Sequence, residues 1–158
     1  MPARLCRLHD GLTVAGFALA AALIGAIAAA YSYEVVARYF LDAPTTWAHD
    51  FSSYALAAVI FLAVPAMTRR GAHVSVTYLT EGLPPAARRA LARAVPGVAA
   101  LVCLLAAWIG AAETWRQYAQ GVETISANPI PKWWVSLFIP YGLASSALYF
   151  VRHLFARA

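Results

Sequence analysis

The chain has 158 residues, of which 62% are hydrophobic and 12% are charged. Soluble domains carry about 25% charged residues, so this composition excludes an ordinary soluble enzyme, and the length suits one domain. The net charge of +5 does not indicate nucleic-acid binding, because the basic residues form no stripe along a soluble surface.

Four stretches of the sequence contain no charged residue and are each long enough to cross a membrane. They cover residues 11–33, 51–68, 94–112 and 133–151. At 1.5 Å per helical residue, 19 residues extend about 28 Å, and the hydrocarbon core of a bilayer is about 30 Å thick. We therefore predict an all-α integral membrane protein with four transmembrane helices. It forms a single four-helix membrane domain over residues 1–158, with spans at about 11–33, 48–68, 90–112 and 133–151.

The first span is rich in small residues. Gly16, Ala20 and Gly25 would let another helix approach closely, although an alanine-rich sequence could show the same pattern for no structural reason. A cleaved signal peptide is the less favoured interpretation, because the apolar core of a signal peptide usually has about 7–15 residues.

The connection between the first two spans carries a charged pair. Glu34 and Arg38 are four residues apart and can pair on one helical face, so the first helix should continue to about residue 39. Residues 41–44 then break it. Thr46 is the expected N-cap of the second helix, and Asp50 falls in its first turn, where the helix dipole favours an anion.

Prolines and glycines shape the remaining helices. Pro65 removes the hydrogen bond to the carbonyl of Phe61 and should bend the second helix, which Gly71 can end in a left-handed conformation. Pro85 can begin the third helix, which is expected to project outward to about residue 118. A loop follows over residues 121–131, and Pro140 should kink the fourth span opposite residue 136.

The basic residues near the span ends predict the orientation of the chain. Lys and Arg accumulate on the cytoplasmic side of a membrane protein. Three of them lie on one side, namely Arg38, Arg116 and Lys132. Nine lie on the side of the termini, namely Arg4, Arg7, Arg69, Arg70, Arg88, Arg89, Arg93, Arg152 and Arg157. Both termini are therefore predicted to be cytoplasmic. The five Trp residues, which favour the interface, lie at or near the outer ends.

The four uncharged stretches also contain no His. Ion-coupled carriers and proton pumps usually keep an ionisable group inside the membrane, and a haem protein needs axial ligands such as His within its helices. His9, His49, His73 and His153 all lie at or beyond the span ends. We therefore predict no catalytic, cofactor-binding or metal-binding residue, and a role as one part of a larger complex.

Several motifs occur in a recognisable order. An Arg-Tyr pair follows the first span, Pro, Trp and an acid open the second, and Arg-Arg-Gly-x-His with alternating apolar residues follows it. These positions are Arg38, Tyr39, Pro44, Trp47, Asp50, Arg69, Arg70, Gly71, His73, Val74 and Val76. With residues 130–133 and 139–142, they resemble the DctQ-type small membrane subunit of tripartite ATP-independent periplasmic (TRAP) transporters. His49, Thr77 and Ala63 depart from the residues frequent in that family.

The resemblance implies a small permease subunit in the bacterial inner membrane. It would act as the scaffold partner of a large permease subunit in sodium-coupled uptake of an organic acid, commonly a carboxylate. A periplasmic binding protein would deliver the acid, and sodium would bind to the large subunit. The alternatives are an autonomous four-helix exporter and an anchoring subunit of an unrelated membrane complex.

Six residues of these motifs are candidate interface or structural residues, namely Arg38, Trp47, Asp50, Arg69, Arg70 and His73. The first three either anchor a helical hairpin at the membrane surface, or Arg38 pairs with Asp50 or Glu34 and holds the turn. The last three either anchor the chain to anionic membrane lipids or make a specific contact with the large subunit or a lipid headgroup.

Overall fold

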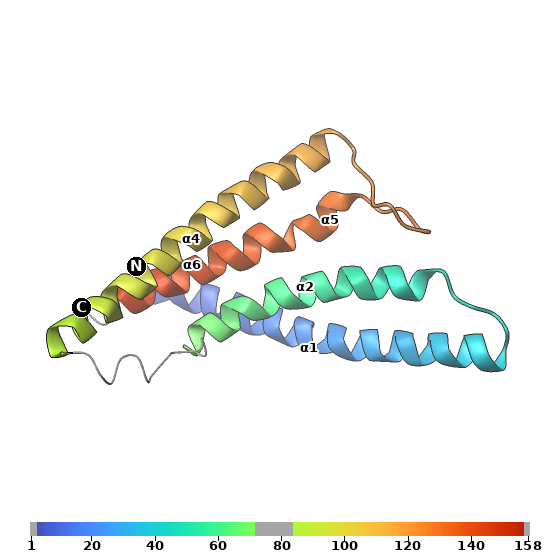
Figure 1. Cartoon of the computed structure of the whole chain (residues 1–158), viewed down its shortest axis with the longest axis horizontal. Helices are drawn as coiled ribbons and strands as arrows, with labels where there is room; N and C mark the ends of the chain where they lie inside the picture. Colours follow the sequence, from blue (N-terminus) through green and yellow to red (C-terminus); the bar gives the residue numbers. More distant parts are fainter. Residues whose placement is uncertain (1–2, 72–83, 157–158) are drawn as a thin grey trace.

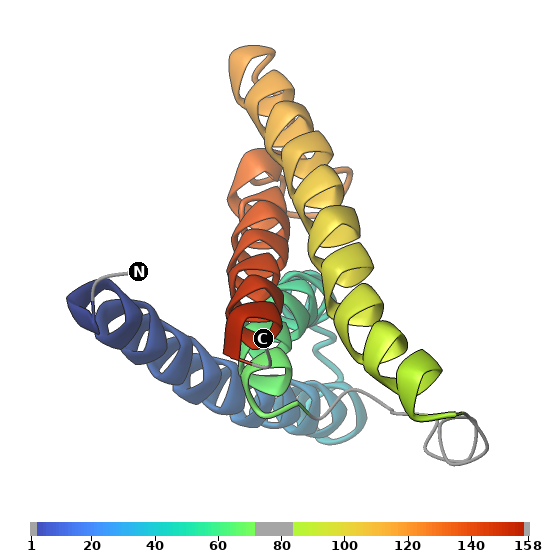
Figure 2. The same cartoon turned by 90° about the vertical axis from the view of Figure 1, so that its left-hand side faces the viewer.

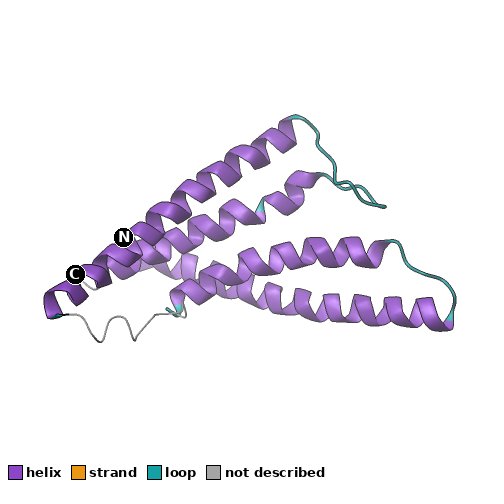
Figure 3. Ribbon diagram, viewed as in Figure 1, coloured by secondary structure: helices purple, strands orange, loops and turns teal. Residues whose placement is uncertain are grey.

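The computed structural model describes residues 3–71 and 84–156. These residues form α1 (Ala3–Phe40), α2 (Trp47–Arg69), α4 (Pro85–Ala119), α5 (Lys132–Ser136) and α6 (Phe138–Ala156) (Figure 1). Within the described ranges, strand-like pairing is confined to one bridge between Glu123 and Pro131 (Figure 3). Four segments are long and apolar enough to cross a membrane, namely Arg4–Phe40, Trp47–Arg69, Ala94–Ala119 and Lys132–Leu154. The predicted all-α membrane fold is confirmed.

The helix ends follow the local sequence signals with one exception. α1 and α4 continue beyond the predicted spans, as expected, to Phe40 and Ala119. Pro85 begins α4, and Gly71 has a φ of +64°, the left-handed conformation predicted for the end of α2. Thr46 is the N-cap residue of α2, but its side chain makes no capping hydrogen bond.

The helices are arranged in a row. α1 packs against α2, α2 against α6, and α6 against α4, so α1 and α4 form the two edges of the row. Near its start α1 also contacts α6 through side chains. The row twists along its length, because α1 and α4 run in clearly different directions (Figures 1 and 2). The two central helices, α2 and α6, therefore carry most of the packing. A core of Ala20, Ala58, Val59 and Leu62 joins α1 to α2.

The small residues of α1 differ in what they contact. A Cβ atom at Gly16 would lie 3.5 Å from Cδ2 of Leu62, and Ala20 is 2% exposed within the core. These two positions confirm the predicted close helix approach. Gly25 is exposed, and a Cβ atom there would meet nothing within 4 Å among the described residues. Gly25 therefore does not contribute to packing within the described chain.

Pro140 interrupts the fourth span as predicted. A proline has no N–H to donate, so the carbonyl of Ser136, four residues earlier, loses its helical donor. The helix breaks between Ser136 and Phe138, which separates α5 from α6. The hydroxyl of Thr114 on α4 donates to the carbonyl of Gly110 at 2.7 Å and shares the same proton with the freed carbonyl oxygen, which lies 3.3 Å away.

Pro65 has the equivalent effect on the carbonyl of Phe61 in α2. Here the neighbouring helix approaches through a glycine. A Cβ atom at Gly142 of α6 would overlap the carbonyl oxygen of Phe61 and would lie 3.0 Å from its carbonyl carbon. Because α2 and α6 pack backbone against backbone at this point, only glycine fits at position 142 without movement.

Candidate functional site

Polar contacts between helices gather at the two ends of the molecule. We call the end that carries the termini and Gly71 the terminal end. The end that carries the connections 41–46 and 120–131 is called the loop end (Figure 1). The uncharged stretches of the sequence lie between the two ends. Each end is therefore a candidate for contact with another molecule through polar groups.

Asp10 is the centre of the polar cluster at the terminal end. Nη1 of Arg152 donates to Oδ1 of Asp10 at 2.6 Å, and the hydroxyl of Tyr149 donates to the same oxygen at 2.9 Å. Nη2 of Arg69 lies 3.7 Å from Oδ2 of Asp10. Because these residues come from α1, α2 and α6, one carboxylate joins three helices.

Neighbouring side chains support this cluster. The hydroxyl of Tyr149 also lies 2.9 Å from Oγ1 of Thr13, which itself donates to the carbonyl of His9 at 3.0 Å. Nε2 of His9 lies 2.8 Å from Oγ of Ser145, and the rings of His9 and Tyr149 are 4.4 Å apart. Thr13 and Tyr149 are almost fully buried, so the cluster is a packed junction of α1 and α6.

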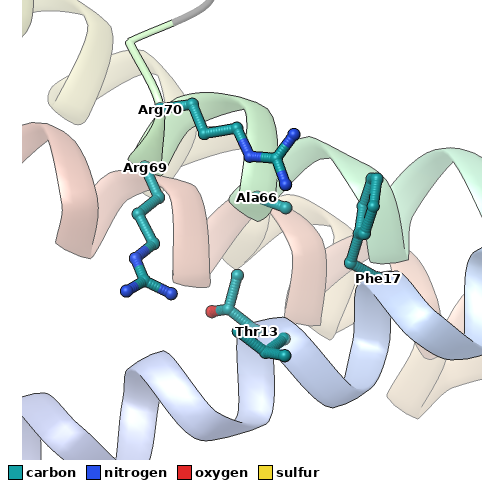
Figure 4. A pocket seen from close by; sticks show the side chains of 6 residues that line it. Thr13, Phe17, Ala66, Arg69 and Arg70 are labelled. Atoms are coloured by element: carbon teal, nitrogen blue, oxygen red, sulfur yellow. The ribbon is translucent and has the colours of Figure 1, made fainter.

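The two predicted arginines line a pocket beside this junction. The guanidinium of Arg70 lies 5.2 Å from the centre of the Phe17 ring, whereas Arg69 extends toward Thr13 on α1 (Figure 4). The pocket lies between α1 and α2 and has a volume of about 400 Å³. Arg69 and Arg70 therefore share a pocket but have different partners. His73, the third predicted residue of this group, lies outside the described residues.

No sequence motif marks Asp10, the acid at this junction. Near the ends of the spans on the side of the termini, the sequence carries nine arginines but only two acids, Asp10 and Glu81. This excess of arginines over acids is the signal that could have pointed to Asp10, because an isolated carboxylate among many arginines has several candidate partners. The contact between Asp10 and Tyr149 spans 139 residues of sequence, so no local spacing could predict it.

At the loop end, Glu34 holds the connection between α1 and α2. It accepts hydrogen bonds from Nη2 of Arg38 at 2.6 Å, from the backbone N–H of Thr45 at 2.9 Å, and from the hydroxyl of Thr45. Glu34 is 9% exposed. The predicted pairing of Arg38 with Glu34 is therefore confirmed, and the same carboxylate also binds the far side of the turn.

The alternative pairing of Arg38 with Asp50 is wrong. Oδ2 of Asp50 instead accepts a hydrogen bond of 3.3 Å from the backbone N–H of Asn128, in the connection that follows α4. Trp47 stacks on Tyr33 of α1 with ring centres 6.1 Å apart. Asp50 and Trp47 therefore join the start of α2 to two different segments.

A second network at this end joins α4 to α5. Oγ of Ser136 donates to Oε1 of Gln117 at 2.7 Å, and Nε2 of Gln117 donates to Glu113 at 3.1 Å. Glu113 also pairs with Arg116 at 2.7 Å. Since Gln117 and Ser136 are buried, this network fastens the last turns of α4 to the start of the fourth span.

We expect double-mutant cycles to separate the two proposed partners of Arg38. The cycle of Arg38→Ala with Glu34→Ala should give a coupling free energy below about 1 kcal/mol but above zero, because the Arg38 side chain is 58% exposed. The cycle of Arg38→Ala with Asp50→Ala should give none. Chemical unfolding in detergent measures both. Coupling only in the second cycle would contradict the contacts described above.

These contacts define a class of protein. No group of three His, Cys, Asp or Glu residues that could hold a metal ion occurs in the part of the chain that the structure describes. The polar groups at both ends bind each other and hold the helices together. The chain is thus a multi-pass membrane protein whose described polar contacts serve mainly to join its helices.

The comparison with known families identifies the class more closely. Residues 27–158 match the family of tripartite ATP-independent periplasmic transporters, DctQ component. Because the match covers most of the chain, the chain belongs to this family and is a small permease subunit of a TRAP transporter. The resemblance found in the sequence motifs is confirmed. The family consists of transporter components rather than enzymes. No curated protein matches the chain.

Proposed function

We propose that this subunit is the scaffold partner of a large permease subunit in the sodium-coupled uptake of an organic acid, such as a carboxylate. A periplasmic binding protein delivers the acid. The family match over residues 27–158 carries this proposal. The uncharged stretches support it, because an ion-coupled path usually needs ionisable groups within the membrane. On this proposal, sodium and the acid bind to the large subunit.

The shape of the subunit supports a scaffold role. In the most apolar stretch of α4 only 11% of the residues are buried, against 44% in α2. A row of helices leaves both of its broad faces and both edge helices open to lipid or to another protein. Transmembrane helices associate through close packing and interhelical hydrogen bonds. Such an exposed surface suits a subunit that packs against the large permease subunit and widens the fixed scaffold of the transporter.

The proposed orientation places the terminal end in the cytoplasm of the bacterial inner membrane. Arg4, Arg7, Arg69 and Arg70 lie near that end of the helices, and an excess of basic residues marks the cytoplasmic side. A cysteine introduced at Asp42, in the loop-end connection, should react with an impermeant reagent added from the periplasm. One introduced at Arg7 should not. The reverse labelling pattern would overturn this orientation.

Reconstituted vesicles test the function. Vesicles that contain this subunit, the large subunit and the binding protein should accumulate a labelled acid when an inward sodium gradient is imposed. Vesicles that lack this subunit should not. Uptake or export by this chain alone would contradict the proposal and favour an autonomous exporter.

A packing variant tests the scaffold role separately. Gly16→Leu adds bulk against Leu62, and such overpacking typically costs about 1–3 kcal/mol. We expect less of the complex to be recovered, with the relative uptake of different acids unchanged. A changed acid preference in a fully assembled complex would show that this subunit lines the transport path.

A further inference from the structure

We propose that the pocket between α1 and α2 at the terminal end binds the phosphate of a membrane phospholipid headgroup. We call it the arginine pocket. Its lining residues are Thr13, Val14, Phe17, Ala66, Arg69 and Arg70. The proposal does not depend on transport, since it concerns lipid held by this chain itself.

The arginine pocket combines two kinds of surface. Arg69 and Arg70, at the end of α2, provide two guanidinium groups, whereas Val14, Phe17 and Ala66 provide an apolar wall (Figure 4). A guanidinium presents a planar fork of N–H donors that matches a phosphate. Phe17 of α1 and Ala66 of α2 lie further from the terminal end of their helices than Arg69 and Arg70 do. This order of polar and apolar groups is the order found along a phospholipid molecule.

The guanidinium of Arg70 is already held in place. It lies 5.2 Å from the centre of the Phe17 ring, within the range of a cation–π contact. This contact restricts the side chain without using its N–H donors on a carboxylate. The donors of Arg70 are therefore available to an anion in the pocket.

The charge around the pocket is unbalanced. Asp10 is the carboxylate at this junction, and Arg152 binds it at 2.6 Å, whereas Arg69 lies 3.7 Å away. Within residues 3–71 and 84–156, the ion pairs include no carboxylate for Arg70. Two arginines thus share the one carboxylate of Asp10, and Arg70 adds a third positive charge beside Phe17, so an additional anion would restore the balance.

The position of the pocket favours a lipid over a dissolved phosphate ion. Arg69 is the last residue of the apolar segment of α2, so the guanidinium groups lie at the level where headgroups begin. Val14 is 58% exposed beside the pocket and would contact an acyl chain. Basic pockets between transmembrane helices are known to bind phospholipid headgroups. A net anionic lipid such as phosphatidylglycerol should bind best, because the cluster carries excess positive charge.

Native mass spectrometry of the delipidated chain in detergent, titrated with phosphatidylglycerol, tests this proposal. We expect Arg70→Ala to weaken binding on the order of tenfold, because charge-assisted bidentate bonds to phosphate are lost. Arg7→Ala is the matched control, since Arg7 is exposed on the same end of α1 and does not line the pocket. The affinity of the Arg7→Ala variant for phosphatidylglycerol should stay near that of the wild type.

The other outcomes also decide the proposal. Equal loss in Arg7→Ala and Arg70→Ala would show general surface attraction and overturn a defined site. Displacement of the lipid by inorganic phosphate at equal concentration would assign the pocket to the free ion, and displacement by the large subunit would assign it to a protein contact. If Arg70→Ala does not fold, Arg70→Lys replaces it, since it keeps the charge but loses the fork. Wild-type affinity in Arg70→Lys would contradict the proposal.

Discussion

Replacing Gly142 with alanine should separate α6 from α2 and lower the free energy of unfolding by about 3 kcal/mol or more, the upper part of the range for overpacking. The added Cβ atom would overlap the carbonyl oxygen of Phe61 and lie 3.0 Å from both the carbonyl carbon and Cβ of that residue. A flexible side chain could rotate away from such a contact. The main chain of a packed helix cannot, so the helices themselves must move.

Pro65 explains why the two backbones meet at this point. Without an N–H at residue 65, the carbonyl of Phe61 has no helical donor, and α6 passes close to it through Gly142. The result would be measured as chemical unfolding of the chain in detergent. Gly25→Ala is the matched control, because a Cβ atom at Gly25 would meet none of the described residues within 4 Å. It should leave stability unchanged or raise it slightly. Equal stability of both variants would refute the close approach of α2 and α6.

The second large effect is expected from Asp10→Ala. This change removes the acceptor of Arg152 and Tyr149 and leaves the positive charges of Arg69 and Arg152 facing each other. Hydrogen bonds to charged groups contribute about 1.5–3 kcal/mol each when they are buried. Because the Asp10 side chain is 26% exposed, we expect a total loss of about 2–3 kcal/mol after allowance for solvent screening.

Glu113→Ala provides the control for Asp10→Ala. It also removes an acid that pairs with an arginine, but the side chains of Glu113 and Arg116 are 44% and 62% exposed. Exposed pairs contribute little to stability, because solvent and salt screen them. Unfolding midpoints in detergent would compare the two variants. In addition, Asp10→Arg combined with Arg152→Asp should recover part of the stability that either change removes. A loss no greater than that of Glu113→Ala would show that Asp10 does not join the helices.

Much of the fold could be predicted from the sequence because its signals are local. The four uncharged stretches fixed the number of spans, and Pro65 and Pro140 fixed the places where carbonyls lose their donors. The arrangement in a row could not be predicted. In a membrane, apolar side chains face lipid and neighbouring helices alike, so the composition of α1 does not distinguish the buried Gly16 from the exposed Gly25.

The candidate residues show the same division between local and distant contacts. The pair of Glu34 and Arg38 follows from helical spacing and was predicted. The hydrogen bond from Asn128 to Asp50 crosses 78 residues and was not. Similarly, the sequence grouped Arg69 with Arg70, whereas the fold brings one toward Asp10 and the other over Phe17. Which distant residues become neighbours depends on how the helices cross, and the sequence pattern does not predict how they cross.

The twist of the row has a consequence for any protein that binds along it. Since α1 and α4 run in different directions (Figure 2), the two edges of the row are inclined to each other. A straight helix keeps contact over its whole length only if it adopts the inclination of the helix beside it. Neighbours at the α1 edge and at the α4 edge must therefore cross the bilayer at different inclinations. A partner that packs along both edges would therefore have to match two inclinations.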